Sequence, residues 1–382
     1  MGENGSFQNQ RGPILLISAR ADFGGGPQQL FQLVNSLKNE FSFFVACPRN
    51  EPYYFLLEQV LGTERLLEIP YRKLCMRSLF YLKEEIRSKK ISLIHSHGKG
   101  AGVYGRLLSL LTGVPVVHTF HGIHTGGLGT LAKFLYLSLE RIFSLFTKQL
   151  ICVSRTEREQ AEGLRIGTEK NRILIENGVK APDEPDMEIP FSQDPLLILS
   201  ITRNDFAKNP ELLIQIAREL KKAGMEKRFK IHAVGLQNRD SLNLMAKDVG
   251  VANMICWHLP TKDLKPFFQK AFCYLSTSRW EGMPLAVLEA MSYGRPVVAS
   301  EVVGNKDLVA DSKSGFLYPR LDPAIAAECI LRLAQSRDLW KRLGAYGRDQ
   351  IQTRFSEERM VMRTRDLYLR FGKEPSKRDA GS

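Results

Sequence analysis

The chain has 382 residues, of which 43% are hydrophobic and 25% are charged. This composition is ordinary for a water-soluble globular protein, and the length predicts two domains. No apolar run reaches the roughly 18–20 residues that a transmembrane helix needs, which argues against a membrane-spanning protein.

The charge balance predicts an anionic partner, because 54 Lys and Arg residues face 41 Asp and Glu residues and the net charge is +13. The basic residues are spread along the chain without a long block or a recognised nucleic-acid module. We therefore expect a phosphorylated substrate and an anionic membrane surface rather than nucleic acid.

The six cysteines are scattered and form no CxxC motif, which is typical of thiols in a reducing compartment. The first dozen residues are polar and contain no apolar signal core. We expect a cytoplasmic protein without a disulfide or zinc framework.

A buried strand is predicted at residues 14–18, followed by Gly24, Gly25 and Gly26 and by a helix at residues 27–38. Glycines between a strand and a helix let the backbone approach a phosphate. The third glycine of the dinucleotide-binding fingerprint is missing, and the next strand, FFVAC, ends without an acidic residue. The run is therefore either a phosphate-binding loop or a plain tight turn.

Histidines follow two further predicted strands. The strand at residues 91–95 leads into HSHGKG, which contains His97 and Lys99. No third ligand with the usual spacing accompanies the paired histidines, so we interpret the segment as polar residues at the end of a strand. Contact of His97 and Lys99 with an acceptor or a phosphate is the alternative.

The strand at residues 115–120 leads to His121, with His118 and His124 on either side. The carboxyl ends of strands in an open α/β sheet face the ligand crevice, so we expect His121 to point into it and His124 to lie on the acceptor side. The apolar segment at residues 128–146, with interspersed Lys and Arg, predicts a helix that lies either on a membrane surface or in the core.

A shift to Pro, Asp and Glu marks a linker at residues 176–195. No DxD triplet occurs, which argues against a metal-chelating transferase site. After the linker, the strand at residues 196–201 leads into a loop flanked by Arg203 and Lys208, two cations that suit a diphosphate.

The most informative stretch is LSTSRWEGMPLAVLEAMSYGRPVVAS, between residues 275 and 300. A buried strand is followed by a loop ending in Glu281-Gly282-Met283-Pro284. A helix starts at Leu285 and carries Glu289, and a second buried strand follows at residues 296–299. The positive end of the helix dipole and the two carboxylates suit a diphosphate and sugar hydroxyls.

This frame, with seven residues between Glu281 and Glu289, resembles the acidic signature of glycosyltransferase family 4. The resemblance covers residues 14–370. It implies an α/β protein with the GT-B fold, in which two Rossmann-like domains face each other across a cleft. Thr202 stands where the family usually has a glycine, and Asn305, Lys306 and Asp307 also depart from its pattern.

The implied division of the chain is a disordered tail (1–12), an acceptor-side domain (13–175), the linker (176–195), a donor-binding domain (196–354), a helix crossing back to the first domain (355–372) and a second disordered tail (373–382).

The resemblance also implies a role for each residue that matches the motif. Glu289 is expected to hold the ribose and Glu281 the sugar hydroxyls. Arg203 and Lys208 are expected to stabilise the leaving diphosphate, and His121 is expected to orient sugar and acceptor. The implied donor-binding set is Gly24, Gly25, Gly26, Arg203, Lys208, Glu281, Gly282, Met283, Pro284, Leu285 and Glu289.

The function we expect is retaining transfer of a hexose-type sugar from a nucleotide-diphosphate-sugar to an acceptor hydroxyl, with neither metal nor cofactor. The acceptor is expected to be a saccharide or a lipid-linked saccharide of cell-envelope polysaccharide, lipopolysaccharide or glycolipid synthesis, at the inner face of the cytoplasmic membrane. The alternatives are a nucleotide-sugar 2-epimerase of the same fold and a non-catalytic nucleotide-sugar-binding protein.

Overall fold

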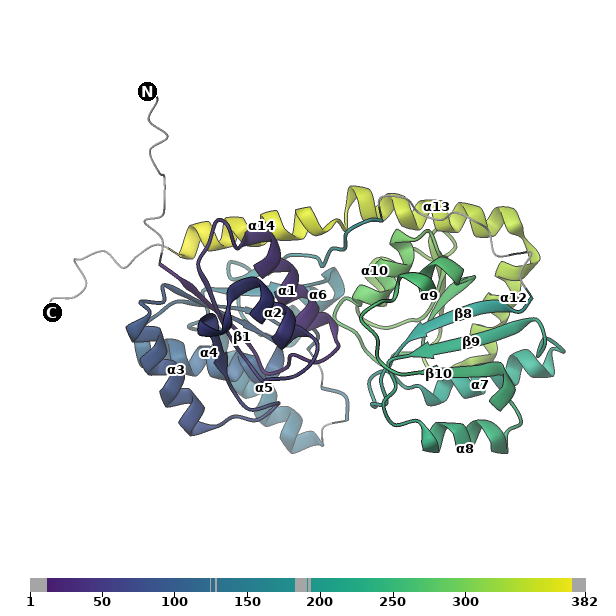
Figure 1. The fold of residues 1–382 in the computed structure, drawn as a ribbon, viewed down its shortest axis with the longest axis horizontal. Helices are drawn as coiled ribbons and strands as arrows, with labels where there is room; N and C mark the ends of the chain where they lie inside the picture. Colours follow the sequence, from purple (N-terminus) through teal and green to yellow (C-terminus); the bar gives the residue numbers. More distant parts are fainter. Residues whose placement is uncertain (1–11, 124, 128, 183–190, 192–193, 373–382) are drawn as a thin grey trace, which may run out of the picture. The chain divides into compact units, whose positions relative to one another are not determined.

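Two parallel sheets organise the chain, each in its own compact unit (Figure 1). The structure is a computed structural model that describes residues 12–123, 125–127, 129–182, 191 and 194–372. Unit 1 comprises Met1–Cys152, Arg158–Ile175 and Val361–Ser382, and unit 2 comprises Val153–Glu157 and Glu176–Met360.

Unit 1 contains a seven-stranded sheet with the order β3-β2-β1-β4-β5-β6-β7. Its strands are β1 (Ile14–Ser18), β2 (Phe43–Cys47), β3 (Leu66–Glu68), β4 (Leu93–His97), β5 (Val116–Thr119), β6 (Gln149–Cys152) and β7 (Arg172–Leu174). The helices are α1 (Gly25–Leu37), α2 (Tyr53–Leu61), the 3-10 turn η1 (Thr63–Arg65), α3 (Met76–Ser88), α4 (Gly98–Thr112), α5 (Thr130–Ser144) and α6 (Arg155–Gly163), and residues 155–157 at the start of α6 belong to unit 2.

Strands β1 and β2 are nearly continuous apolar runs and are almost entirely buried, as is typical of parallel sheets covered on both faces. Strand order reverses between β1 and β4, which pair with each other so that Ser18 lies opposite His97. This switch point brings the loops after β1 and β4 together at the carboxyl edge of the sheet, where open α/β sheets bind ligands.

Unit 2 contains a six-stranded sheet with the order β10-β9-β8-β11-β12-β13. Its strands are β8 (Leu196–Ile201), β9 (Phe229–Val234), β10 (Ile255–His258), β11 (Cys273–Ser276), β12 (Val297–Ser300) and β13 (Gly315–Tyr318). The helices are α7 (Glu211–Lys222), α8 (Asp240–Asp248), the 3-10 turn η3 (Ala252–Met254), α9 (Lys265–Lys270), α10 (Leu285–Ser292), α11 (Asn305–Leu308), α12 (Pro323–Gln335) and α13 (Arg337–Thr353).

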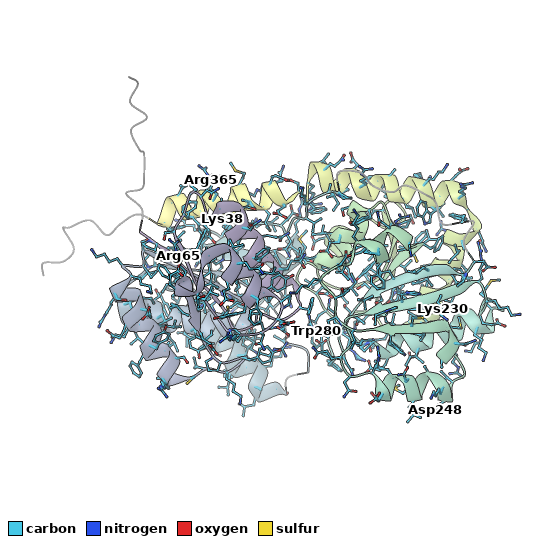
Figure 2. All side chains as sticks on the ribbon, viewed as in Figure 1. Lys38, Arg65, Lys230, Asp248, Trp280 and Arg365 are labelled. Atoms are coloured by element: carbon cyan, nitrogen blue, oxygen red, sulfur yellow. The ribbon has the colours of Figure 1, made fainter. Side chains whose placement is uncertain are left out.

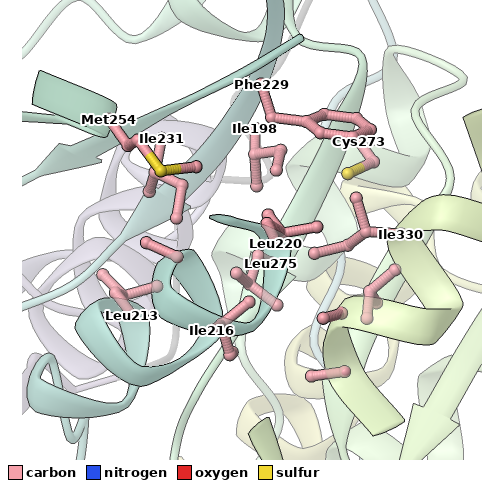
Figure 3. Close-up of a cluster of buried hydrophobic side chains, with 14 of the residues drawn as sticks. Ile198, Leu213, Ile216, Leu220, Phe229, Ile231, Met254, Cys273, Leu275 and Ile330 are labelled. Atoms are coloured by element: carbon pink, nitrogen blue, oxygen red, sulfur yellow. The ribbon is translucent and has the colours of Figure 1, made fainter. Parts of the chain in front are cut away.

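Each face of this second sheet has its own buried core. Ile198, Ile231 and Leu275 of the sheet pack against Leu213 of α7 and Ile330 of α12 on one face (Figure 3). A second cluster, which includes residues of α9, α10 and α11, fills the opposite face. The sheet is thereby held rigid, and its carboxyl-end loops project from a fixed edge.

The terminal helix α14 (Glu357–Phe371) belongs to unit 1 from Val361 onward. Arg365, which is labelled in Figure 2, forms an ion pair with Glu40 at 2.6 Å. The Tyr368 hydroxyl lies 2.7 Å from Nδ1 of His95. The helix therefore contacts the middle of β4 through the bond between Tyr368 and His95.

Two expected boundaries differ from the structure. β4 runs to His97 instead of ending at residue 95, because His97 pairs with Ser18 on one side and Thr119 on the other. The helix after β1 starts at Gly25, so two of the three glycines lie in its first turn. Sheet pairing and helix propagation here outweigh the turn preference of polar residues and glycine.

Part of the expected linker is fixed to unit 2. Glu176 forms an ion pair with Arg354 at 2.5 Å, and Val179 pairs with the backbone of Phe355 and Glu357. The side chain of Asn177 donates to the carbonyl oxygen of Met283 at 2.8 Å. This segment therefore positions the loop that precedes α10.

Candidate functional site

Lys208 and Glu281, which are 73 residues apart in the chain, form an ion pair in unit 2. Nζ of Lys208 lies 2.5 Å from Oε1 of Glu281, and the two side chains are only 18% and 12% exposed. The hydroxyl of Ser278 donates to the same oxygen at 2.6 Å. Lys208 follows β8 and Glu281 follows β11, and these strands are neighbours, so the sheet brings the two charges together.

Arg203 is held within its own loop by Asp205. Nε and Nη2 of Arg203 both lie 2.9 Å from Oδ2 of Asp205, whose Oδ1 accepts the backbone N–H of Lys208. Burial raises the pKa of Asp205, but the Arg203 guanidinium and the Lys208 amide outweigh it and lower the pKa overall. The two expected diphosphate-binding cations thus share one structured loop.

The loops after β8 and β11 are locked to each other. The hydroxyl of Thr277 donates to the carbonyl of Lys208, and the backbone N–H of Arg279 donates to the carbonyl of Ala207. The Arg279 guanidinium donates to the side chain of Asn209 at 2.6 Å. These bonds keep Lys208 and Glu281 on a preorganised surface.

Helix α10 starts at Leu285, as expected from the sequence, and Pro284 is its N-cap. The amides of Val287 and Leu288 donate to the carbonyl of Pro284, which leaves Leu285 and Ala286 as the residues that present the positive end of the helix.

Glu289 is half-buried on α10. Burial and the negative charges of Glu281 and Glu289 raise the pKa of Tyr274, and burial together with Glu289 and Asp263 raises the pKa of Tyr293. Both carboxylates of the motif therefore lie close enough to Tyr274 of β11 to affect its pKa.

Three contacts that the sequence did not reveal support the loop that contains Glu281 and Gly282. Gly304, with φ of 84°, packs against the backbone of Gly282. Thr156 donates to Asp307 through its hydroxyl and, at 3.1 Å, through its amide, and it accepts the amide of Gly304. Thr156 and Asp307 are 151 residues apart, and no local pattern indicates the pairing.

We expect Gly304→Ala to destabilise unit 2 by at least about 1 kcal/mol more than Gly224→Ala. Both glycines have positive φ, but a methyl group at 304 meets the Gly282 oxygen at 2.5 Å, whereas one at 224 meets nothing within 4 Å. All three tryptophans lie in unit 2, so urea unfolding followed by tryptophan fluorescence measures this unit. Equal losses in the two variants would contradict the packing role.

In unit 1, His121 has a positive φ of 57°, a left-handed backbone conformation that is uncommon for residues other than glycine. Its Nε2 lies 3.2 Å from Nδ1 of His97, and the two rings are stacked. A Cβ atom built on Gly26 would lie 3.5 Å from the His121 ring. The structure thus brings together His121, His97 and the glycine run.

The neighbouring histidines are buried structural groups. His95 bridges Tyr368 and Thr119, and burial followed by the charge of His121 lowers its pKa to about 3. His118 contacts the hydroxyl of Ser96 at 2.9 Å, and burial lowers its pKa well below the usual value. Burial also lowers the pKa of His97, a residue that is only 4% exposed.

Of the other two expected acceptor-side residues, Lys99 lies against α5, with its Nζ 3.8 Å from the ring centre of Tyr136. His124 lies outside the described residues. A polar group that sequence reasoning missed follows β1, where Arg20 pairs with Asp22 at 2.7 Å and Tyr71 donates to Asp22 at 3.1 Å.

Comparison with known proteins identifies the family. Residues 23–181 match Glycosyltransferase Family 4, and residues 183–350 match Glycosyl transferases group 1.

Two relatives come from Escherichia coli. The chain is 26% identical over 314 residues to UDP-Gal:alpha-D-GlcNAc-diphosphoundecaprenol alpha-1,3-galactosyltransferase, which covers 77% of this chain and 79% of the relative. It is 23% identical over 299 residues to the O-antigen biosynthesis glycosyltransferase WbnH, which covers 77% and 82%.

Solved structures share the fold. HepE of Anabaena in complex with UDP-glucose superposes with a TM-score of 0.81 at 16% identity, covering 94% of this chain and 99% of HepE. Sucrose-phosphate synthase from Thermosynechococcus elongatus gives a TM-score of 0.79 at 20% identity, covering 94% and 99%. The chain therefore belongs to glycosyltransferase family 4 and is a glycosyltransferase with the GT-B fold.

Proposed function

We propose that the protein transfers a hexose-type sugar, with retention of configuration, from a nucleotide-diphosphate-sugar to a lipid-linked saccharide at an anionic membrane surface. The donor part of the proposal rests on the partly buried Lys208–Glu281 pair at the carboxyl edge of the second sheet. The proposed lipid-linked acceptor rests on the exposed apolar face of α5. The E. coli galactosyltransferase, named for a UDP-Gal donor and a diphosphoundecaprenol acceptor, supports both substrate classes.

Each charged group has a task in this reaction. Lys208 and Arg203 neutralise the diphosphate as the bond from the anomeric carbon to its oxygen breaks. Glu281 exchanges its bond to Lys208 for bonds to sugar hydroxyls, and Glu289 holds the ribose. Gly282 and Leu285 offer backbone N–H groups to the phosphates, with Met283 and Pro284 shaping the turn between them.

The acceptor hydroxyl attacks the anomeric carbon from the side on which the diphosphate leaves. Its proton passes to the departing phosphate oxygen, so the new glycosidic bond keeps the original configuration and no protein nucleophile is needed. His121 orients the sugar and the acceptor, supported by His97 and the turn of Gly24, Gly25 and Gly26. The assignment of Lys99 and His124 to the acceptor rests on their positions after predicted strands.

Helix α5 presents an apolar face to solvent, which we call the α5 face. The exposed side chains recur at helical spacing, and Leu131 and Leu145 at its two ends are 72% and 81% exposed. The α5 face consists of Leu131, Phe134, Leu135, Leu139, Ile142 and Leu145. Soluble proteins rarely expose so continuous a stripe unless it binds something.

The charges around the α5 face favour an anionic membrane as its partner. The one acidic residue of helix α5, Glu140, is buried and pairs with Arg106 at 3.0 Å. Lys133 and Lys148, in contrast, are exposed. Apolar residues with surrounding cations are typical of helices that lie in the surface of anionic bilayers. None of the described helices is long and apolar enough to cross a membrane.

The first test is release of nucleoside diphosphate from a panel of UDP-, GDP- and ADP-sugars, with and without a membrane lipid extract. We expect release from one donor and a clear increase with the extract. Release that does not respond to the extract contradicts a lipid-linked acceptor. A changed sugar without release favours the 2-epimerase, and tight nucleotide binding without release from any donor favours a non-catalytic binder.

A further inference from the structure

Three side chains that commonly bind metals lie together at one edge of the unit 2 sheet. His232 of β9 and Cys256 and His258 of β10 hold their ligand atoms within 4.8 Å of one another. Lys208 and Glu281 follow β8 and β11, and the transfer reaction uses none of the three residues. The cluster therefore needs an explanation of its own.

Sheet geometry places all three on one face. Cys256 lies directly opposite His232 in the parallel pair of β9 and β10, and His258 is two residues further along β10. Phe229 and Ile231 point into the core on the other face (Figure 3). Because side chains alternate along a strand, the three ligands project together, and this projection does not depend on a flexible loop.

The distance between the two imidazole nitrogens matches tetrahedral zinc. Nδ1 of His232 and Nε2 of His258 are 3.2 Å apart. With Zn–N bonds of about 2.0–2.1 Å, two nitrogens at a tetrahedral angle lie about 3.3 Å apart. The same two nitrogens can instead share a proton, so a zinc ion would replace that hydrogen bond with little movement of either ring.

The types of ligand and their surroundings favour zinc over a hard cation. Imidazole nitrogen and thiolate sulfur are ligands that zinc takes in proteins. Lys230 and Lys270 lie close enough to His232 to act on it electrostatically. The nearby cations, of which Lys230 is marked in Figure 2, oppose a hard cation such as Mg²⁺, whereas a thiolate offsets this repulsion for zinc.

We propose that His232, Cys256 and His258 bind a zinc ion through two imidazole nitrogens and one thiolate, with water as the fourth ligand. Binding releases the thiol proton to solvent. The carbonyl oxygen of His258 accepts the amides of Gly235 and Leu236, both at 3.1 Å. The ion therefore fixes the ends of β9 and β10 and the turns that follow them, which is a structural role separate from sugar transfer.

The test uses the full chain, freed of metal by a chelator and then dialysed, and titrated with Zn²⁺ alone in a calorimeter. We expect one site whose affinity falls at least about tenfold in Cys256→Ser and in His258→Gln. Cys329→Ser is the matched control, because Cys329 is also partly buried in unit 2 but lies outside the cluster. Circular dichroism of each variant checks that it folds.

Two further readouts identify the ligands. Co²⁺ bound in place of zinc is expected to show a thiolate charge-transfer band that Cys256→Ser loses and Cys329→Ser keeps. Zinc is expected to raise the thermal midpoint of unit 2, followed by tryptophan fluorescence, in the wild type and in Cys329→Ser but not in Cys256→Ser. Equal Zn²⁺ affinity in the wild type and Cys256→Ser, or no stoichiometric binding, overturns the proposal. Neither outcome bears on sugar transfer.

Discussion

Glu281→Ala and Lys208→Ala are each expected to lower kcat/KM for sugar transfer by more than about tenfold, a loss of over about 1.4 kcal/mol in transition-state stabilisation. Lys208 loses its role at the diphosphate in one variant, and Glu281 loses its bonds to the sugar in the other. Each substitution also removes the 2.5 Å contact that fixes the remaining partner.

Because the two side chains share this contact, the double variant is expected to lose less than the sum of the two single losses. The control is the Lys306–Glu301 pair, which also lies in unit 2 but is about half exposed with a separation of 2.9 Å. Lys306→Ala is expected to leave transfer unchanged, since exposed ion pairs contribute little. Unchanged rates in both Glu281→Ala and Lys208→Ala would remove this pair from the reaction.

Leu135→Glu combined with Ile142→Glu is expected to weaken binding to anionic vesicles at low salt by at least about thirtyfold. Both side chains are more than half exposed on the α5 face, and their burial in lipid is worth at least about 2 kcal/mol in total. The added carboxylates also repel the anionic surface. Co-sedimentation with vesicles measures the binding.

The matched control carries the same charge change on unit 2, at Leu244 and Met245 of α8, which are exposed to a similar degree. This control is expected to bind vesicles like the wild type. The α5 variant should keep its affinity for the nucleotide, since the α5 face and Lys208 belong to different units. Vesicle binding that is absent in the wild type, or unchanged in the α5 variant, contradicts the membrane proposal.

The expectation of no zinc framework rested on the absence of a CxxC motif, whereas the proposed zinc site uses His232, Cys256 and His258. Cys256 and His258 are two residues apart, but His232 is 24 residues from Cys256, so no short spacing in the sequence links all three. The proximity arises only because β9 and β10 pair in one register. A shift of that register by one residue would turn Cys256 and His258 to the other face.

The sequence determined the elements and the motif residues. Apolar runs predicted β1, β2 and β8 within a residue of their observed ends, and the EGMP–LEAM frame identified the family. Such features are local, because the periodicity of a buried strand and the start of a helix depend on neighbouring residues. The short strand β3 and helix α2 were not predicted, because so few residues give a weak periodic signal.

Only the tertiary structure decided which side chains meet. It joined Lys208 to Glu281, Thr156 to Asp307, and His121 to His97 and Gly26. It also showed that the α5 face is exposed, where the sequence left a core helix and a surface helix equally open. These contacts depend on strand order and register, which arise from packing of the whole sheet. The pattern of neighbouring residues in the sequence therefore does not indicate them.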